Sequence, residues 1–169
     1  SAWTVIACGR RSVNGTYSAL VAKAGSGAST TRNFQLFNDY STGEYAVRVR
    51  GTATTITATN VTAMHQLAFT WDGSAAKTYI DSGSAVTTSV GTAAAETENI
   101  LIGARTLASP DNFLTGHVRY VLLFNRALSQ SEIASIYADP TALLSESSVV
   151  THDTSGALSA SAASVSGTV

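Results

Sequence analysis

Short apolar runs recur along the chain, and each ends at a cluster of glycine, asparagine, aspartate or serine residues. Residues 44–50 show the clearest alternation, because aromatic and aliphatic residues alternate there with small or cationic ones. This period of two predicts a strand with one buried side and one side in solvent. The whole pattern predicts strands over residues 2–8, 17–22, 33–37, 44–50, 54–59, 66–71, 77–80, 85–90, 100–102 and 117–124.

The spacing of the turns decides between the β architectures. Turn signals come about every ten residues, which is typical of an antiparallel β-sandwich or jelly roll. Parallel βαβ units are excluded, because no helical crossover fits between the strands. Residues 117–124 are almost wholly apolar, which predicts a central strand that is covered on both faces. The fold class is therefore predicted as all-β, with one short helix near the end.

That helix is predicted at residues 129–138. Ser129 is a good N-cap, and Glu132 three residues later completes a capping box. Pro140 disfavours helix at the residue before it and ends the element. The residues expected to share the buried face of the helix are Ile133, Ile136 and Tyr137.

Length and composition indicate one domain with an appendage. The chain has 169 residues, and we expect a domain at 1–143 and a Ser/Ala-rich linker or the start of a following β module at 144–169. It begins at a serine without a signal peptide, so we expect it to be part of a larger polypeptide or assembly. Only 12% of its residues are charged, against about 25% in an ordinary soluble domain. Such a surface is typical of extracellular or particle-bound β proteins.

Charge and hydropathy exclude two kinds of partner. The formal net charge is −1 and no basic run is present, so we expect no nucleic-acid partner. No apolar stretch reaches the ~18 residues of a membrane span, and we expect no membrane partner. The single cysteine, Cys8, is expected to be a small buried hydrophobic residue. His117 flanks the apolar strand and is expected to be a structural histidine.

Four segments from residue 66 onward resemble one family. They are an apolar strand with an Asp-Gly turn at 66–73, a returning strand at 79–81, an aliphatic strand that ends on glycine at 100–103, and the last strand and helix at 113–133. These segments resemble the laminin-G-like domains of the concanavalin-A-like lectin and glucanase superfamily, and the resemblance covers residues 2–143. It implies a concanavalin-A-like sandwich that serves binding or assembly.

The sequence departs from the family pattern in three places. Met64 stands where the family commonly has tryptophan, and Arg119 stands where many members carry an acidic residue. The family's opening segment before residues 1–8 is absent, and we expect either that this piece has been removed or that another chain supplies the strand. The tail from His152 resembles Ser-Gly-Ala-Leu segments of phage and prophage structural proteins, which implies a virion protein.

Hydrolases of this fold use paired carboxylates two residues apart, followed by a third acid. The nearest match is Glu96 and Glu98, but Leu101 occupies the position of the third acid. The sequence therefore favours a chain that is not an enzyme, with a glycan-processing hydrolase as the alternative.

The predicted turns hold the candidate ligand-binding residues. A calcium ion needs several oxygen atoms that converge from loops, and the candidates for such a site are Asn38, Asp39 and Asp72. The alternative is that these residues only build turns through side-chain to backbone hydrogen bonds. A glycan needs aromatic faces and planar polar groups, and the candidates for that site are Tyr40, Trp71, Asp111, Asn112 and Phe113.

These observations predict a non-catalytic adhesive or assembly module. Its loops at the edge of the sandwich would bind a glycan or a neighbouring structural subunit, while the sandwich holds them rigid. We expect it to lie in a virion, as capsid decoration or fibre, or outside the cell. A purely architectural virion domain without a ligand is the further alternative.

Overall fold

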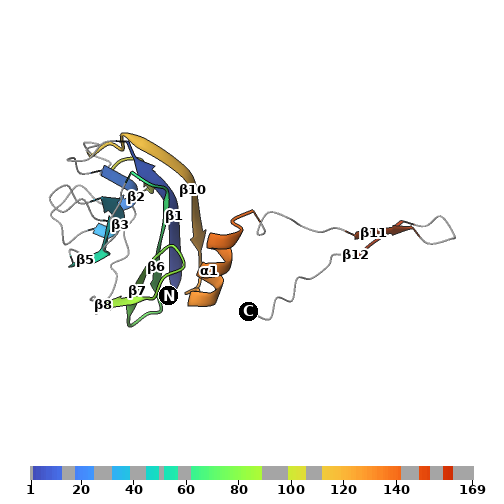
Figure 1. The fold of residues 1–169 in the computed structure, drawn as a ribbon. Helices are drawn as coiled ribbons and strands as arrows, with labels where there is room; N and C mark the ends of the chain where they lie inside the picture. Colours follow the sequence, from blue (N-terminus) through green and yellow to red (C-terminus); the bar gives the residue numbers. More distant parts are fainter. Residues whose placement is uncertain are drawn as a thin grey trace.

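The computed structural model describes residues 2–12, 18–24, 32–38, 45–49, 52–56, 62–88, 99–105, 112–141, 149–152 and 158–161. Two five-stranded antiparallel sheets stack as two layers (Figure 1). Sheet A has the strand order β10-β1-β6-β7-β8 and sheet B the order β5-β4-β3-β2-β9. This arrangement confirms the predicted antiparallel β-sandwich with one short helix.

The strands lie close to the positions that the apolar pattern predicts. Sheet A contains β1 (Trp3–Arg11), β6 (His65–Trp71), β7 (Ala76–Ile80), β8 (Val86–Thr88) and β10 (Gly116–Phe124). Sheet B contains β2 (Ser18–Ala24), β3 (Arg32–Asn38), β4 (Tyr45–Val49), β5 (Thr52–Ile56) and β9 (Leu101–Ile102). In the tail, β11 (Val149–His152) and β12 (Leu158–Ser161) pair with each other as an antiparallel hairpin.

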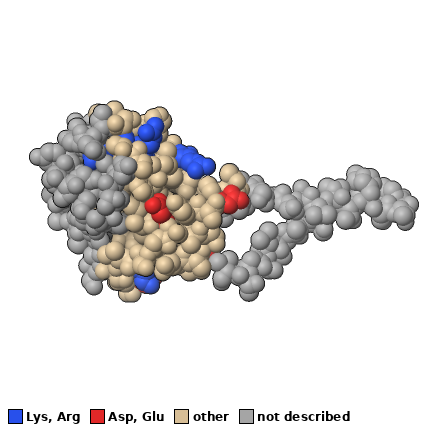
Figure 2. All heavy atoms as spheres, viewed as in Figure 1, with Lys and Arg blue, Asp and Glu red and all other residues tan. Residues whose placement is uncertain are grey.

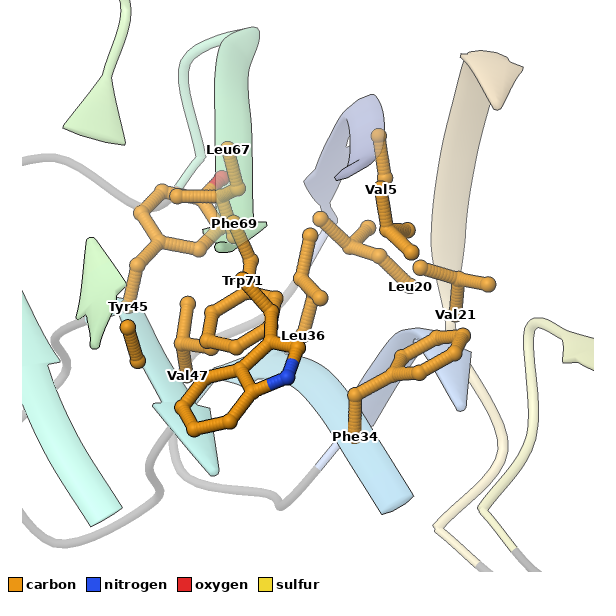
Figure 3. Close-up of a cluster of buried hydrophobic side chains, with 12 residues drawn as sticks. Val5, Leu20, Val21, Phe34, Leu36, Tyr45, Val47, Leu67, Phe69 and Trp71 are labelled. Carbon is orange, nitrogen blue, oxygen red and sulfur yellow. The ribbon is translucent and has the colours of Figure 1, made fainter. Parts of the chain in front are cut away.

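The main hydrophobic core fills the space between the two sheets (Figure 3). Every second residue of a strand points inward, so Leu67, Phe69 and Trp71 of β6 face Leu36 of β3 and Val47 of β4. Aromatic rings contact one another in this core in tilted arrangements: the ring of Trp3 lies 5.0 Å from that of Phe69 and 5.4 Å from that of Phe34, centroid to centroid.

A smaller core lies on the outer face of sheet A, beneath α1 (Gln130–Ala138). Ser129 caps this helix and forms the predicted capping box with Glu132. Ile133 and Ile136 are buried against the sheet, but Tyr137 is exposed, so its predicted place on the buried face is wrong. A nine-residue helix presents a narrow stripe to a flat sheet, and two isoleucines fill that stripe.

The position of β10 corrects a second expectation. It pairs with β1 on one side, and within the described part of the chain no strand pairs on the other. β10 is therefore the edge strand of sheet A and not a central strand. Its apolar composition has another cause, because its residues alternate between the two hydrophobic cores: Val118 and Val121 contact the inner core, while Tyr120, Leu122 and Phe124 contact the outer core.

Buried polar groups connect the last strand, the helix and the first strand. Thr4 donates from its hydroxyl to the carbonyl oxygen of Arg126 at 2.8 Å and accepts from the backbone N–H of Leu128 at 2.9 Å. These two hydrogen bonds hold the chain between β10 and α1 against β1. A buried hydroxyl that is satisfied in both roles stabilises this junction without a desolvation penalty.

Candidate functional site

One candidate region, the loop at Asn112 and Phe113, is firmly attached to sheet B. The carbonyl oxygen of Asn112 accepts a hydrogen bond from the N–H of Ala19 in β2 at 3.1 Å, and the N–H of Leu114 donates to the carbonyl of Gly103 at 2.9 Å. Gly103 in turn donates to Leu20 of β2 at 3.0 Å. The backbone of this loop is thus continuous with the edge of the sheet and is held in one conformation.

The side chain of Asn112 is held as well. Its backbone has a positive φ of 50°, a left-handed conformation that asparagine adopts more readily than most residues. With the amide oxygen turned toward Arg105, that oxygen accepts hydrogen bonds from Nε at 3.0 Å and from Nη1 at 3.1 Å. The pair places a guanidinium group at the base of the loop.

Phe113 is the aromatic residue that this loop presents. Its side chain is 63% exposed, and Ile102, which precedes the carbonyl group bonded to the loop, is 60% exposed. We call Ile102, Arg105, Asn112 and Phe113 the Phe113 patch. It combines an exposed apolar surface with a cation and an amide that are fixed in place. A sugar needs this combination, since its C–H face packs on apolar groups and its hydroxyls form hydrogen bonds.

Trp71 does not belong to this site. Its side chain is only 4% exposed and lies in the core between the sheets (Figure 3). The expectation of a ligand-binding role is wrong for this residue, because Trp71 is still part of β6 and points to the same side as Phe69. A residue that directly precedes an Asp-Gly turn can therefore still belong to the strand, with its side chain in the core.

Asp72 builds a turn. Its Oδ1 atom accepts hydrogen bonds from the N–H of Ala75 at 2.8 Å and from both the N–H and the hydroxyl of Ser74, at 2.8 and 2.9 Å. The bonds from Ala75 and Ser74 lower the pKa of this carboxyl to about 2. This is the alternative that the sequence left open for the aspartates, and it accounts for the turn after β6.

The calcium site cannot be assembled from the described residues. Of the three calcium candidates, Asp39 lies outside them, and of Asn38 only the backbone in β3 is described. Two of the glycan candidates, Tyr40 and Asp111, also lie outside the described residues. Among the described residues no three histidine, cysteine, aspartate or glutamate side chains are grouped so that they could hold a metal ion. The Oδ1 atom of Asp72 already accepts the hydrogen bonds of the turn, and this single carboxylate does not form a calcium site without further ligands.

The described groups capable of nucleophilic or acid-base chemistry include Cys8 and His65, which lie on the adjacent strands β1 and β6. Cys8 is buried, as expected, and burial raises the pKa of its thiol, so the reactive thiolate is disfavoured. His65 pairs with Asp81 at 2.8 Å through Nδ1. His117 is exposed, which corrects its expected structural role. Glu96 and Glu98 lie outside the described residues.

Sequence reasoning identified Asn112 and Phe113 but missed Ile102 and Arg105. Ile102 had been assigned to a strand, and alternation alone does not tell which face of a two-residue edge strand is covered. Arg105 had no signal of its own, because its contact with Asn112 depends on the hydrogen bond that joins the two loops.

No helix among the described residues is long and apolar enough to cross a membrane.

The two stacked antiparallel sheets and the helix on the outer face define a β-sandwich. A family model described as the concanavalin A-like lectin/glucanases superfamily, Laminin G 3, matches residues 1–134. The chain belongs to this family, as the resemblance over residues 2–143 had implied. No characterised protein matches the chain in sequence.

Solved structures with the same fold include carbohydrate-binding and sialidase chains. The CBM40 of the Ruminococcus gnavus IT-sialidase, bound to α2,3-sialyllactose, superimposes with a TM-score of 0.64 at 14% identity, over 80% of this chain and 82% of that chain. A mutant of Trypanosoma rangeli sialidase with trans-sialidase activity gives a TM-score of 0.63 at 17% identity, over 80% of this chain. The chain spans only 22% of that sialidase. At these identities the similarity shows the fold.

Proposed function

We propose that the chain is a non-catalytic glycan-binding module and that the Phe113 patch is its binding site. The observation that carries the proposal is the exposed Phe113 ring on a loop that is hydrogen-bonded to both β2 and the end of β9. An apolar ring that is exposed to this extent at a rigid edge costs solvation in the free protein. Its burial under a sugar ring offsets that cost.

The similarity to a carbohydrate-binding module supports this function. This chain covers 82% of the length of that module but only 22% of the length of the sialidase. The two glutamates on which the hydrolase alternative rests, Glu96 and Glu98, lie outside the described residues, so no observed geometry supports that alternative. As part of the proposal, residues 1–143 form the binding domain and residues 144–169 a linker or the beginning of a further module.

The setting of the module is a second part of the proposal. A surface rich in serine and threonine with few charges suits an extracellular protein or a virion component, such as a capsid decoration or fibre. Neighbouring structural subunits are then additional partners. A purely architectural domain is the competing explanation, and it requires no ligand at Phe113.

A glycan panel with two variants tests the function. We expect the wild type to bind at least one glycan and Phe113→Ala to weaken that binding by about tenfold, the loss of ~1.4 kcal/mol of packing. Tyr137→Ala is the matched control, because it removes an exposed aromatic ring on the far side of the sandwich, on α1. Equal binding by Phe113→Ala and the wild type would contradict the assignment of the site, and no binding to any glycan would favour the architectural domain.

A further inference from the structure

Two glycines bring the end of β1 and the beginning of β10 unusually close together. A Cβ atom on Gly116 would lie 2.1 Å from the carbonyl oxygen of Arg10, and one on Gly9 would lie 2.7 Å from the carbonyl oxygen of His117. Both contacts are with backbone atoms, which cannot move aside without distorting the sheet. The local geometry therefore requires glycine at both positions.

A β-bulge lies in the same place. Cys8 is paired with Tyr120 and Gly9 with Val118, so Arg119 has no partner on β1. The next pair is Arg10 with His117. Partners in an antiparallel pair point to the same face of a sheet, and a bulge redirects the side chain of the extra residue. The bulge thus adds a second arginine beside a pair that already holds one.

We call Arg10, His117 and Arg119 the basic cluster. His117 and Arg119 are exposed and Arg10 is half-buried. None of the three side chains forms a hydrogen bond or an ion pair with another described residue. The chain as a whole has a net charge of −1, so this concentration of positive charge is local. In Figure 2, most of the visible lysine and arginine atoms lie toward the upper side of the sandwich, and the visible acidic atoms lie lower.

Charged residues on an edge strand have another common purpose, which is to prevent pairing with other chains. Arg119 and His117 lie on the edge strand β10 and would serve that purpose. Arg10 is paired with His117 of β10, and the pairing of β1 with β6 ends one residue earlier, at Gly9 with His65. Cations that lie together without an anionic partner among the described residues repel one another, and an anionic ligand would relieve that repulsion.

The basic cluster and the Phe113 patch lie at the same end of the molecule. His117 follows Phe113 by four residues, so no more than about 14 Å of chain separates their Cα atoms. The N–H of Ser12, just after β1, donates to the carbonyl of Thr115 at 2.7 Å and fixes this connection to the end of β1. Arg105 of the Phe113 patch adds a further guanidinium group, which contacts the amide of Asn112.

We propose, building on the glycan-binding function above, that the ligand is an acidic glycan. A sugar ring packs on Phe113, and a carboxylate or sulfate group of the same glycan is held by Arg10, His117 and Arg119. Guanidinium groups form short charge-assisted hydrogen bonds with such anions. Because these bonds form near the surface, binding weakens as salt concentration rises.

The test is a calorimetric titration with lactose, α2,3-sialyllactose and a sulfated lactose, which differ in the presence and type of anion. We expect the wild type to bind at least one of the two acidic sugars about tenfold more tightly than lactose. Arg119→Gln should weaken that binding threefold to tenfold and leave lactose binding unchanged. Lys77→Gln, which removes one exposed cation from β7, should change neither.

The outcomes separate this inference from the function on which it rests. Equal affinity for lactose and both acidic sugars, or equal effects of Arg119→Gln and Lys77→Gln, would overturn the acidic ligand and leave glycan binding in place. Failure of all three sugars and of the wider glycan panel would overturn both. An Arg10→Gln and Arg119→Gln double variant with an unchanged unfolding midpoint verifies that a loss of binding is not a loss of fold.

Discussion

Tyr120 and Gln66 are joined by a hydrogen bond of 2.7 Å, in which the phenol hydroxyl donates to Oε1 of the amide. The two residues lie on β10 and β6, with β1 between them. The same amide donates from Nε2 to the carbonyl oxygen of Ile133 in α1 at 3.2 Å. One buried glutamine thereby connects the edge strand, an interior strand and the helix on the outer face of sheet A.

This connection predicts the effect of removing a single oxygen atom. Tyr120→Phe leaves the ring in place but deprives Oε1 of Gln66 of its donor, and a buried acceptor without a partner costs about 1–3 kcal/mol. We expect the midpoint of urea unfolding to fall with no change in the slope of the transition. Tyr137→Phe, which removes an exposed hydroxyl, should shift the midpoint by less than about 0.5 kcal/mol. Equal small effects of both changes would show that the Gln66 bond contributes nothing.

The close approach of β1 and β10 gives a second prediction. Gly116→Ala places a methyl group against the backbone of Arg10 and Arg11, at 2.1 Å from the nearest atom. The strands must separate to accommodate it, and we expect a loss of about 2 kcal/mol or more in the free energy of unfolding. Gly83→Ala is a milder comparison, since its Cβ would lie 3.0 Å from the nearest atom. Should Gly116→Ala be as stable as the wild type, β10 does not pair with β1 in this register.

Glu132 gives a prediction for pH. The hydrogen bond from Arg126, with those from Ser129, lowers its pKa from 4.5 to about 2, while partial burial opposes this effect. A carboxyl whose pKa is depressed on folding stabilises the protein above the pKa of the unfolded chain, and loses that contribution as the pH falls toward the folded value. The window is therefore pH 4.5 down to 2.

Glu132→Gln measures this contribution directly, because the amide keeps the size and can retain the capping contact. Arg126 is 58% exposed and Glu132 14% exposed, so solvent screens the pair and we expect a loss of about 1 kcal/mol at pH 7. The difference between wild type and variant should shrink steadily below pH 4.5. A difference that is constant from pH 7 to pH 3 would mean that the negative charge is not what stabilises the helix start.

The fold was predictable from the sequence because its signals are local. Alternation, turn residues and the capping box at Ser129 act within a few positions of each other, and the strands and helix were found close to their true places. The predictions that were wrong concern features that depend on residues close in space but distant in the sequence. A central strand and an edge strand whose two faces contact different cores can both have an apolar sequence like that of β10, so the sequence alone does not distinguish them.

The site was predictable only in part for the same reason. Phe113 could be found because its neighbours Asp111 and Asn112 mark a turn, whereas Trp71 was misplaced because an adjacent Asp-Gly turn does not reveal where the strand ends. The basic cluster could not be foreseen. Arg10 and Arg119 are 109 positions apart (119 − 10), and only the register of β1 with β10 and its bulge bring them together.

The most direct test of the account is to locate a bound glycan by amide proton–nitrogen correlation spectra of the labelled chain. Titration with α2,3-sialyllactose or sulfated lactose is predicted to shift the amides of Arg105, Asn112, Phe113, His117 and Arg119, with the helix at 130–138 unaffected. Shifts confined to the helix or to the opposite end of the sandwich, or no shifts at millimolar sugar, would contradict it.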